Sequence, residues 1–342
     1  MNDTFTMGFI FVPVGLEPQV RKEQTLLPPH ILLWKGGFAM RMKVGIVGYG
    51  NLGKGAEAAV MQQGDMQIVG LFSRREGLMS ASRVRVYPMD AIMDLRKYLD
   101  VLILCGGSAK DLPEQSPRLS KEFPIVDSFD DHENAAAHIA ACNNENHAAI
   151  VCAGWDPGLF SIQRVLCKSF FPHLQIHTFW GPGISQGHSN ALRQIDGVID
   201  ARQYTIPNEA ALQKAREGKY LLKEKMHRRV CHVAIEPGAD QDRIRDEILN
   251  MPHYFAPYET DVHFVPKEEL SKSLAHGGRV IGGGGQMELS FSLTSNPQFT
   301  GAVLTAYARA AWRLEQEGNF GAKTPLDVPV SYLCPIDAEE FL

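Results

Sequence analysis

The sequence contains no run of about 18 apolar residues, the length that a helix needs to cross a bilayer. It also lacks a surplus of basic residues: 34 Lys and Arg stand against 39 Asp and Glu, for a formal net charge of -5 at pH 7. A general nucleic-acid binder would show a basic face, so that class is disfavoured. The apolar segment 7–16 contains a proline and follows Asp3 instead of basic residues, which makes it a poor signal peptide. We expect a cytoplasmic protein that binds neither nucleic acid nor a membrane.

Cysteine is also scarce. No two of the six cysteines are spaced as C-x-x-C, and no Cys/His cluster has the spacing of metal ligands. We therefore expect no metal site, and we expect thiols that stay reduced in a reducing compartment.

The first 41 residues show no clear hydrophobic period and are interrupted by prolines at positions 13, 18, 28 and 29. A short apolar run, "MKVGIVG", then begins at Met42. We interpret Met42, or Met40, as the working start and residues 1–41 as a dispensable leader. The alternative is an ordered arm that packs on a partner subunit.

From residue 42 to residue 155, apolar runs of four to eight residues alternate with helical segments. This pattern is typical of strands that are buried on both faces of a parallel sheet. It predicts an α/β fold with a doubly wound parallel sheet of the Rossmann type. The expected strands cover residues 42–48, 66–73, 99–107, 123–130 and 148–155, and the expected helices cover residues 52–63 and 133–145.

The pattern changes over residues 156–296, where strand-like runs such as "VIDARQYTIP" and "MELSFSLTS" dominate. Helical segments lie near residues 210–217 and 242–250. We expect a second, α+β domain with an open and largely antiparallel sheet, in which the glycines at 282–285 form a flexible loop. An amphipathic helix over residues 298–317 follows this domain.

Three glycines at the end of the first expected strand form the pattern G-x-G-x-x-G. Gly48 would permit a tight turn, Gly50 would let a pyrophosphate approach the backbone, and Gly53 would let helix and strand pack closely. The free N–H groups of the helix start favour phosphate. The pattern predicts a dinucleotide site; the alternative is a structural glycine turn.

The end of the second expected strand indicates which dinucleotide is bound. NAD enzymes usually carry Asp or Glu about 20 residues after the glycine pattern, where it binds the ribose 2′-hydroxyl. This chain instead has Ser73, Arg74 and Arg75. Two guanidinium groups and a hydroxyl suit a 2′-phosphate. The sequence therefore predicts NADP.

Further polar residues follow the other expected strands, where ligands of open α/β sheets bind. Residues 105–108 (CGGS) end the third strand, Asp127 and Asp130 end the fourth, and "GWDPG" (154–158) ends the fifth. Asp130 and Asp156 make a carboxylate pair suited to an ammonium group. Mixed Arg, His, Asn and Thr residues in the second domain suit a carboxylate. These features favour an NADP-linked enzyme that acts on an amino acid.

From residue 42 onward the chain resembles the meso-diaminopimelate dehydrogenases. The matching stretches include "VGIVGYGNLGKG", "FSRR", "GWDPGLFS", "HTFWGPGISQGHSNALR", "MPHYF" and "NPQFT". The resemblance implies an NADP-dependent enzyme of lysine biosynthesis and a homodimer. It also implies that residues 297–342 return to the nucleotide domain (42–155), whereas residues 156–296 bind substrate and form the dimer.

The resemblance also implies site residues. Asp130 and Asp156 would be catalytic and would hold the ammonium group of the substrate. The other expected substrate contacts are Trp180, Gln186, Gly187, Thr205, Arg229, His276 and Asn296. The expected cofactor contacts are Gly48, Tyr49, Gly50, Asn51, Leu52, Gly53, Ser73, Arg74, Arg75, Cys105, Gly106, Gly107, Ser108, Ser128, Phe129, Asp130, Ala153, Gly154, Trp155, Asp156 and Pro157.

Such an enzyme would oxidise the D-centre of meso-2,6-diaminopimelate to L-2-amino-6-oxopimelate and ammonia. Two rival interpretations stay open. One is an opine or saccharopine type of NADP-dependent amino-acid dehydrogenase. The other is a non-enzymatic NADP sensor, which would need the glycine turn and the arginines but not the GWDPG segment or a distant arginine. Arg228 is the alternative to Arg229 as that arginine.

Overall fold

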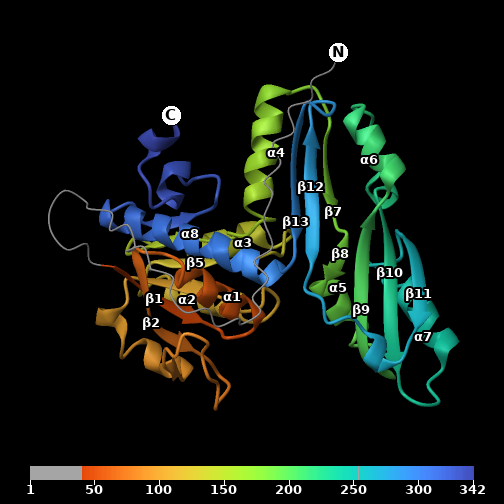
Figure 1. Cartoon of the computed structure of the whole chain (residues 1–342), viewed down its shortest axis with the longest axis horizontal. Coiled ribbons are helices and arrows are strands. Elements are labelled where there is room, and N and C mark those ends of the chain that lie inside the picture. The colour runs from red at the N-terminus through yellow and green to blue at the C-terminus, as the bar shows by residue number, and fades with distance from the viewer. Residues whose placement is uncertain (1–40, 253) are drawn as a thin grey trace, which may run out of the picture. The chain divides into compact units, whose positions relative to one another are not determined.

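The computed structural model describes residues 41–252 and 254–342, so the expectation about the leader lies almost entirely outside the described residues. These residues form two compact units (Figure 1). One unit comprises residues 41–162 and 297–342, and the other comprises residues 163–296. The first unit extends past residue 155 because the GWDPG turn is hydrogen-bonded to the first turn of the helix that follows it.

A seven-stranded sheet forms the centre of the first unit, and all of its neighbouring strands are parallel. The strand order is β14-β6-β5-β4-β1-β2-β3. The expected doubly wound Rossmann sheet is confirmed. The strands are β1 (Met42–Val47), β2 (Met66–Phe72), β3 (Val86–Tyr87), β4 (Val101–Leu104), β5 (Ile125–Asp127), β6 (Ala148–Ile150) and β14 (Gly321–Lys323).

Successive residues of the central strands face two separate apolar cores, because side chains alternate across a strand. Ile103 of β4 joins the core beneath α1 (Asn51–Val60) and α8 (Asn296–Gln316). Leu102 and Leu104 join the other core, beneath α2 (Leu112–Leu119) and α3 (Ala135–Cys142). Burial on both faces explains why these strands read as uninterrupted apolar runs.

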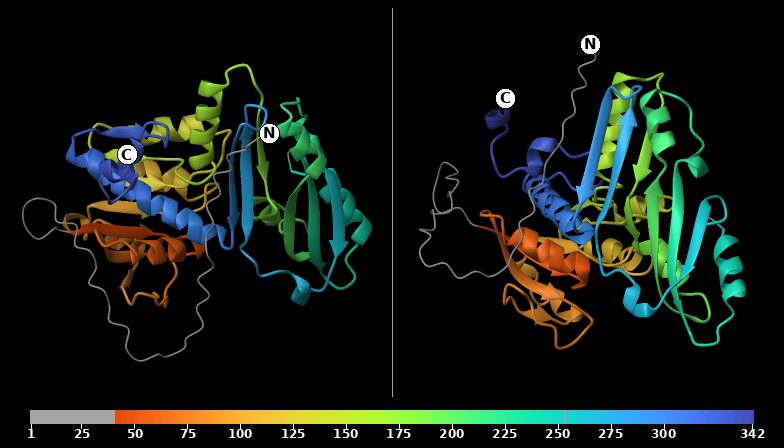
Figure 2. Two further views of the ribbon diagram at one scale, coloured as in Figure 1. Left: turned by 45° about the horizontal axis from the view of Figure 1, so that its top comes forward. Right: turned by 45° about the vertical axis from the view of Figure 1, so that its right-hand side comes forward.

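Two smaller sheets form the second unit, instead of the one open sheet that the sequence indicated. Figure 2 shows the long strands β9 and β10 side by side in the larger of them. Every strand pair of the unit is antiparallel except β10 with β11. The larger sheet contains β8 (Gly183–Ser185), β9 (Val198–Pro207), β10 (His227–Ile235) and β11 (Glu259–Phe264), and the smaller one contains β7 (Ile176–Trp180), β12 (His276–Gly282) and β13 (Met287–Leu293).

The glycine run ends β12 and makes the turn into β13. Gly283, Gly284 and Gly285 all have positive φ, a conformation that other residues rarely adopt. The remaining helices are α4 (Leu159–Phe170), which begins in the first unit, α5 (Gln186–Leu192), α6 (Glu209–Arg216) and α7 (Gln241–Leu249). Short 3-10 helices lie at Met89–Ile92, Arg96–Tyr98, Lys223–Lys225, Lys267–Glu269, Val330–Leu333 and Ala338–Phe341.

Within residues 41–252 and 254–342, every helix is too short or too polar to span a bilayer.

Candidate active site

The glycine turn between β1 and α1 has the geometry of a dinucleotide site. Gly48 has a φ of +92°, which a residue with a side chain would rarely adopt. A Cβ at Gly53 would lie 2.1 Å from the carbonyl oxygen of Gly48, so helix and strand pack in contact there. A Cβ at Gly50 would meet nothing within 4 Å. No packing contact within the described chain explains this second glycine, whereas the approach of a pyrophosphate does.

Side chains around the turn hold it in place. The Tyr49 hydroxyl donates to the buried carboxylate of Glu57 at 2.5 Å, and Arg75 donates to the Tyr49 carbonyl oxygen. Asn51 and Leu52 open α1, whose first turn carries no acidic residue that would repel phosphate.

A hollow of about 590 Å³ lies at the end of β2. It is lined by Ser73, Arg74, Arg75 and residues 76–78 and 86–90. Arg74 is mostly exposed and donates to Asp111 at 2.7 Å. A hydroxyl and two guanidinium groups at the edge of this hollow fit the 2′-phosphate of NADP.

The segment after β4 connects to the segment after β5. A Cβ at Gly106 would lie 2.6 Å from the Cβ of Asp111, and the Gly107 N–H donates to the Asp111 carboxylate at 3.0 Å. The Ser108 hydroxyl oxygen then accepts from the Asp130 N–H at 3.1 Å. Cys105 is half-buried, and burial raises the pKa of its thiol, so it is a neutral neighbour of this segment.

The two candidate carboxylates follow adjacent strands. Asp130 is exposed after β5, next to the half-buried Ser128 and the buried Phe129. Asp156 is half-buried in the turn after β6, between the buried Trp155 and the half-buried Pro157. Because the carboxyl ends of parallel strands meet at one sheet edge, both carboxylates belong to the ligand-binding edge of the first unit.

The GWDPG turn is tightly closed. The Gly154 N–H donates to the Pro157 carbonyl at 2.9 Å, and a Cβ at Gly158 would lie 1.8 Å from the Gly154 carbonyl oxygen. The Trp155 ring packs edge-on against Phe160, with 5.2 Å between ring centroids. Ala153, three residues after β6, is fully buried. The hydrogen bond and the close packing of this turn fix the backbone position of Asp156.

The second unit buries a guanidinium group that has no anionic partner among the described residues. Arg229 of β10 lies opposite Thr205 of β9 and donates to its hydroxyl at 2.6 Å. Its guanidinium carbon lies 4.3 Å from the centre of the Tyr258 ring. No carboxylate in residues 41–252 or 254–342 forms an ion pair with it, and its Nε has no hydrogen-bond partner there. Arg228 is exposed and pairs with Asp261 at 3.7 Å.

Neutral histidines surround this cation. Burial, with a smaller contribution from the charge of Arg229, lowers the pKa of His227 to about 3 and that of His188 to about 4. Burial also lowers the pKa of His276 to about 4. The uncompensated positive charge therefore resides on Arg229 and suits a carboxylate ligand.

The other expected substrate contacts lie at the ends of elements in the second unit. Trp180 ends β7 and donates its backbone N–H to His227 Nε2 at 2.9 Å. A Cβ at Gly183 would lie 2.5 Å from the Cα of His276, and Gly183 is paired with Thr205, so His276 is close to the Thr205–Arg229 pair. Gln186 and Gly187 are exposed at the start of α5, and Asn296 begins α8.

Sequence reasoning did not single out His227, His188 or Tyr258, which surround Arg229. Strand alternation places His227 on the same face as Arg229, so this residue could have been found from the "HRRVC" run. Tyr258 precedes β11 and carries no such signal, because only the fold brings it to β10.

Known proteins match most of the chain. Residues 154–294 match the family described as the diaminopimelic acid dehydrogenase C-terminal domain. A meso-diaminopimelate D-dehydrogenase of Acetivibrio thermocellus is 44% identical over 327 residues, which cover 89% of this chain and 98% of the relative. The enzyme of the same name from Ureibacillus thermosphaericus is 45% identical over 318 residues, covering 88% and 98%.

Two solved structures are similar over the same span. The C. glutamicum DAP dehydrogenase in complex with DAP is 40% identical, with a TM-score of 0.83. An engineered D-amino acid dehydrogenase bound to NADP+ is 39% identical, with a TM-score of 0.79. Each match covers 88% of this chain and 98% of the solved chain.

Proposed function

Because the chain belongs to the meso-diaminopimelate dehydrogenase family, we propose that it oxidises meso-2,6-diaminopimelate in the reactions of lysine biosynthesis. The reaction is the reversible, NADP-dependent deamination of the D-centre to L-2-amino-6-oxopimelate and ammonia. The observation that carries this assignment is Arg229, a buried guanidinium without an anionic partner among the described residues. A second carboxylate, remote from the reacting centre, is the group that distinguishes this substrate from simple D-amino acids.

NADP supplies the hydride acceptor of the reaction. The chain's own residues would hold it: Gly50 would leave room for the pyrophosphate, and Arg74 and Arg75, which line the hollow after β2, would bind the 2′-phosphate. The residues that follow β4, β5 and β6 complete the cofactor site.

Asp130 and Asp156 hold the ammonium group of the D-centre, and this pair takes up its proton as hydride leaves the adjacent carbon. The resulting imine is hydrolysed by water. Trp180, Gln186 and Gly187 orient the carboxylate next to the reacting carbon. Arg229, Thr205, His276 and Asn296 hold the distant L-centre. Alignment of the reacting carbon with the cofactor is the main contribution of the protein to the rate.

The proposal includes a homodimer and a cytoplasmic location. Light scattering of the purified full chain tests the first: a mass of one chain across the working concentration range would contradict it.

An assay of NADPH formation tests the proposed function. The purified protein should reduce NADP with meso-diaminopimelate and release ammonia, and Asp156→Asn should lose most of the turnover while it still binds NADP. An opine or saccharopine type of enzyme would instead need a keto acid together with an amino acid. If NADP binds but absorbance stays flat with meso-diaminopimelate, the proposal fails and an NADP sensor remains.

A further inference from the structure

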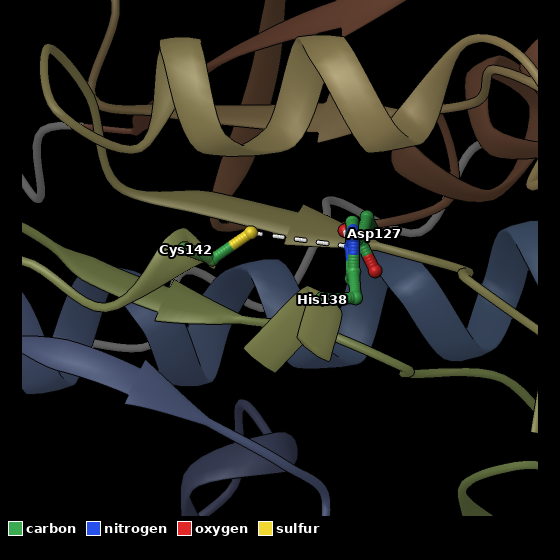
Figure 3. A group of neighbouring side chains, drawn as sticks. All are labelled: Asp127, His138 and Cys142. Carbon is green, nitrogen blue, oxygen red and sulfur yellow. Dashed lines mark hydrogen bonds and ion pairs between the residues drawn. The ribbon is translucent and has the colours of Figure 1, made fainter. Parts of the chain in front are cut away.

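The carboxylate of Asp127, the last residue of β5, is fully buried, and both of its oxygens accept hydrogen bonds. Its Oδ2 accepts from the Ser116 hydroxyl at 2.6 Å and lies 2.7 Å from His138 Nε2. Its Oδ1 accepts from the backbone N–H groups of Phe129 at 3.1 Å and Cys152 at 2.9 Å. Figure 3 shows the carboxylate close to the His138 ring, with Cys142 to one side and a dashed line from its sulfur to His138.

Three of these side chains, Asp127, His138 and Cys142, are close enough to suggest a metal site. The distances favour hydrogen bonds instead. Two ligands on one tetrahedral zinc ion lie roughly 3.3 Å apart, given metal–ligand bonds of about 2.0–2.1 Å. The 2.7 Å between Oδ2 and Nε2 is a hydrogen-bond distance. Burial and the charge of Asp127 raise the pKa of the Cys142 thiol, which keeps it protonated and a poor ligand.

The two bonds to Oδ1 have a different consequence, because they reach segments on two neighbouring strands. Phe129 immediately precedes Asp130, and its ring stacks on His138 with 3.9 Å between ring centroids. Cys152 follows β6 and begins the path to Asp156. It has a φ of +57°, which is rare for a residue with a side chain and is kept only where neighbouring groups enforce it.

A backbone bond reinforces this connection. The Ala153 N–H donates to the carbonyl oxygen of Asp127 at 2.8 Å, so Asp127 binds the Cys152–Ala153 segment with both its side chain and its main chain. One residue thus holds the segment before Asp130 and the segment before Asp156.

We propose that Asp127 is a positioning residue that sets the relative placement of Asp130 and Asp156. This inference rests on the proposed function, in which those two carboxylates hold the reacting ammonium. Hydride transfer tolerates little misplacement, since an error of about 1 Å in a reacting group costs on the order of 100-fold in rate. Asp127 itself is fully buried, so it acts through the two segments that it binds.

Three full-length variants and one control test this role. Asp127→Ala removes the acceptor for both N–H groups. If the alanine variant does not fold, Asp127→Ser, which keeps one polar group at this position, takes its place. Asp127→Asn keeps an oxygen for Phe129 and Cys152, while its amide donates to Ser116 and to His138 in the other tautomer. The matched control is Ser116→Ala, which removes a buried hydrogen bond from Oδ2 alone.

The readouts are kcat with meso-diaminopimelate, the primary deuterium isotope effect with substrate labelled at the D-centre, and the NADP dissociation constant. Asp127→Ala, or Asp127→Ser, should lower kcat by about 10- to 100-fold and raise the isotope effect, because misplaced groups slow the hydride step itself. The NADP dissociation constant should rise by a smaller factor than kcat falls, because Asp127 does not bind the glycine turn or the arginines that hold the phosphates. Asp127→Asn and Ser116→Ala should stay close to the parent.

A merely structural role would reduce the amount of active enzyme and leave the isotope effect unchanged. An unchanged isotope effect would overturn the positioning role, and so would a fall in kcat for Ser116→Ala as large as that for Asp127→Ala. Neither result would affect the proposed function, because the parent enzyme would still be active. A parent enzyme that is inactive with meso-diaminopimelate would instead overturn the proposed function and, with it, this inference.

Discussion

Two buried arginines of this protein differ in their partners, and the difference separates a structural residue from a ligand-binding one. Arg309 donates to both carboxylate oxygens of Asp65, at 2.6 and 2.9 Å, and also to the Gln63 side chain and the Leu333 carbonyl. Arg229 donates to one hydroxyl and packs on one aromatic ring. A buried charge is costly unless it is paired, so a charge left unpaired in the described chain indicates an anionic ligand.

Replacement of Arg229 should therefore alter selectivity for substrates. Arg229→Ala removes one member of a buried charge pair with the distant carboxylate, which costs about 2–5 kcal/mol, or roughly 30- to 4,000-fold in kcat/KM. Activity on a D-amino acid without a second carboxylate should fall far less. The measurement is the ratio of the two activities in the parent and in the variant. Arg228→Ala, on the exposed face of β10, is the control; equal losses on both substrates in Arg229→Ala would assign this residue to the fold.

Cofactor selectivity should depend on Arg74. Arg74→Ala removes a charge-assisted bond to the 2′-phosphate, which is worth about 1.5–3 kcal/mol, or roughly 10- to 150-fold in affinity for NADP. NAD lacks this phosphate, so its binding should barely change. Arg75→Ala serves as a contrast: Arg75 also donates to the Tyr49 carbonyl in the glycine turn, so its loss should weaken both nucleotides. Fluorescence titration with each nucleotide measures the two affinities. An equal loss of affinity for NAD and NADP in Arg74→Ala would contradict the proposed role of Arg74.

At the scale of elements, the strand–turn–helix unit at β1 and α1 uses its glycines for different purposes. Gly53 serves packing, because its missing side chain lets α1 approach the Gly48 carbonyl. Gly50 faces open space in the described chain, so only a ligand requires it to be a glycine. The two positions can therefore be tested against each other.

We predict that Gly53→Ala destabilises the fold and that Gly50→Ala does not. The Cβ of the first would overlap the turn, and overpacking of this kind costs about 1–3 kcal/mol. The Cβ of the second would occupy only the space of the pyrophosphate. Thermal unfolding should thus show a lower Tm for Gly53→Ala alone, whereas calorimetric titration should show weaker NADP binding for both. An unchanged NADP affinity in Gly50→Ala would show that the cofactor does not bind at this turn.

At the scale of the whole molecule, the first unit is assembled from two distant parts of the chain. Its sheet ends with β14, which pairs with β6, and helix α8 covers one face. Arg309 of α8 binds Asp65, which is 244 residues away in sequence. The unit that carries the nucleotide site is thus complete only when residues 297–342 have returned to it.

The packing of residues 297–342 on the rest of the first unit should depend on Arg309. Arg309→Ala leaves Asp65 without its partner and should cost about 3 kcal/mol, at the lower end for a buried pair because Asp65 is partly exposed. Arg96→Ala is the matched control, since the exposed Arg96–Glu122 pair at 2.7 Å should contribute less than about 1 kcal/mol. Urea unfolding monitors both variants. Similar midpoints for the two variants would show that α8 is held by apolar packing alone.

Much of the architecture could be predicted from local sequence. The apolar runs at β1, β4 and β5 were recognisable because a strand buried on both faces is apolar over most of its length. The two-residue β3 and three-residue β14 were not recognised, because neither lies in a long apolar run. The division of the second unit into two sheets was also missed, since strand pairing depends on residues far apart in sequence.

The sequence by itself determined the parallel Rossmann sheet and the glycine turn, because period, glycine spacing and strand ends are properties of neighbouring residues. Only the tertiary structure decided that Arg229 is buried and Arg228 is not, and that Asp127 is enclosed whereas Asp130 is exposed. Each pair lies on one short segment with similar local surroundings. Which member is covered depends on Thr205, Tyr258, Ser116 and His138, which other elements bring into contact with it.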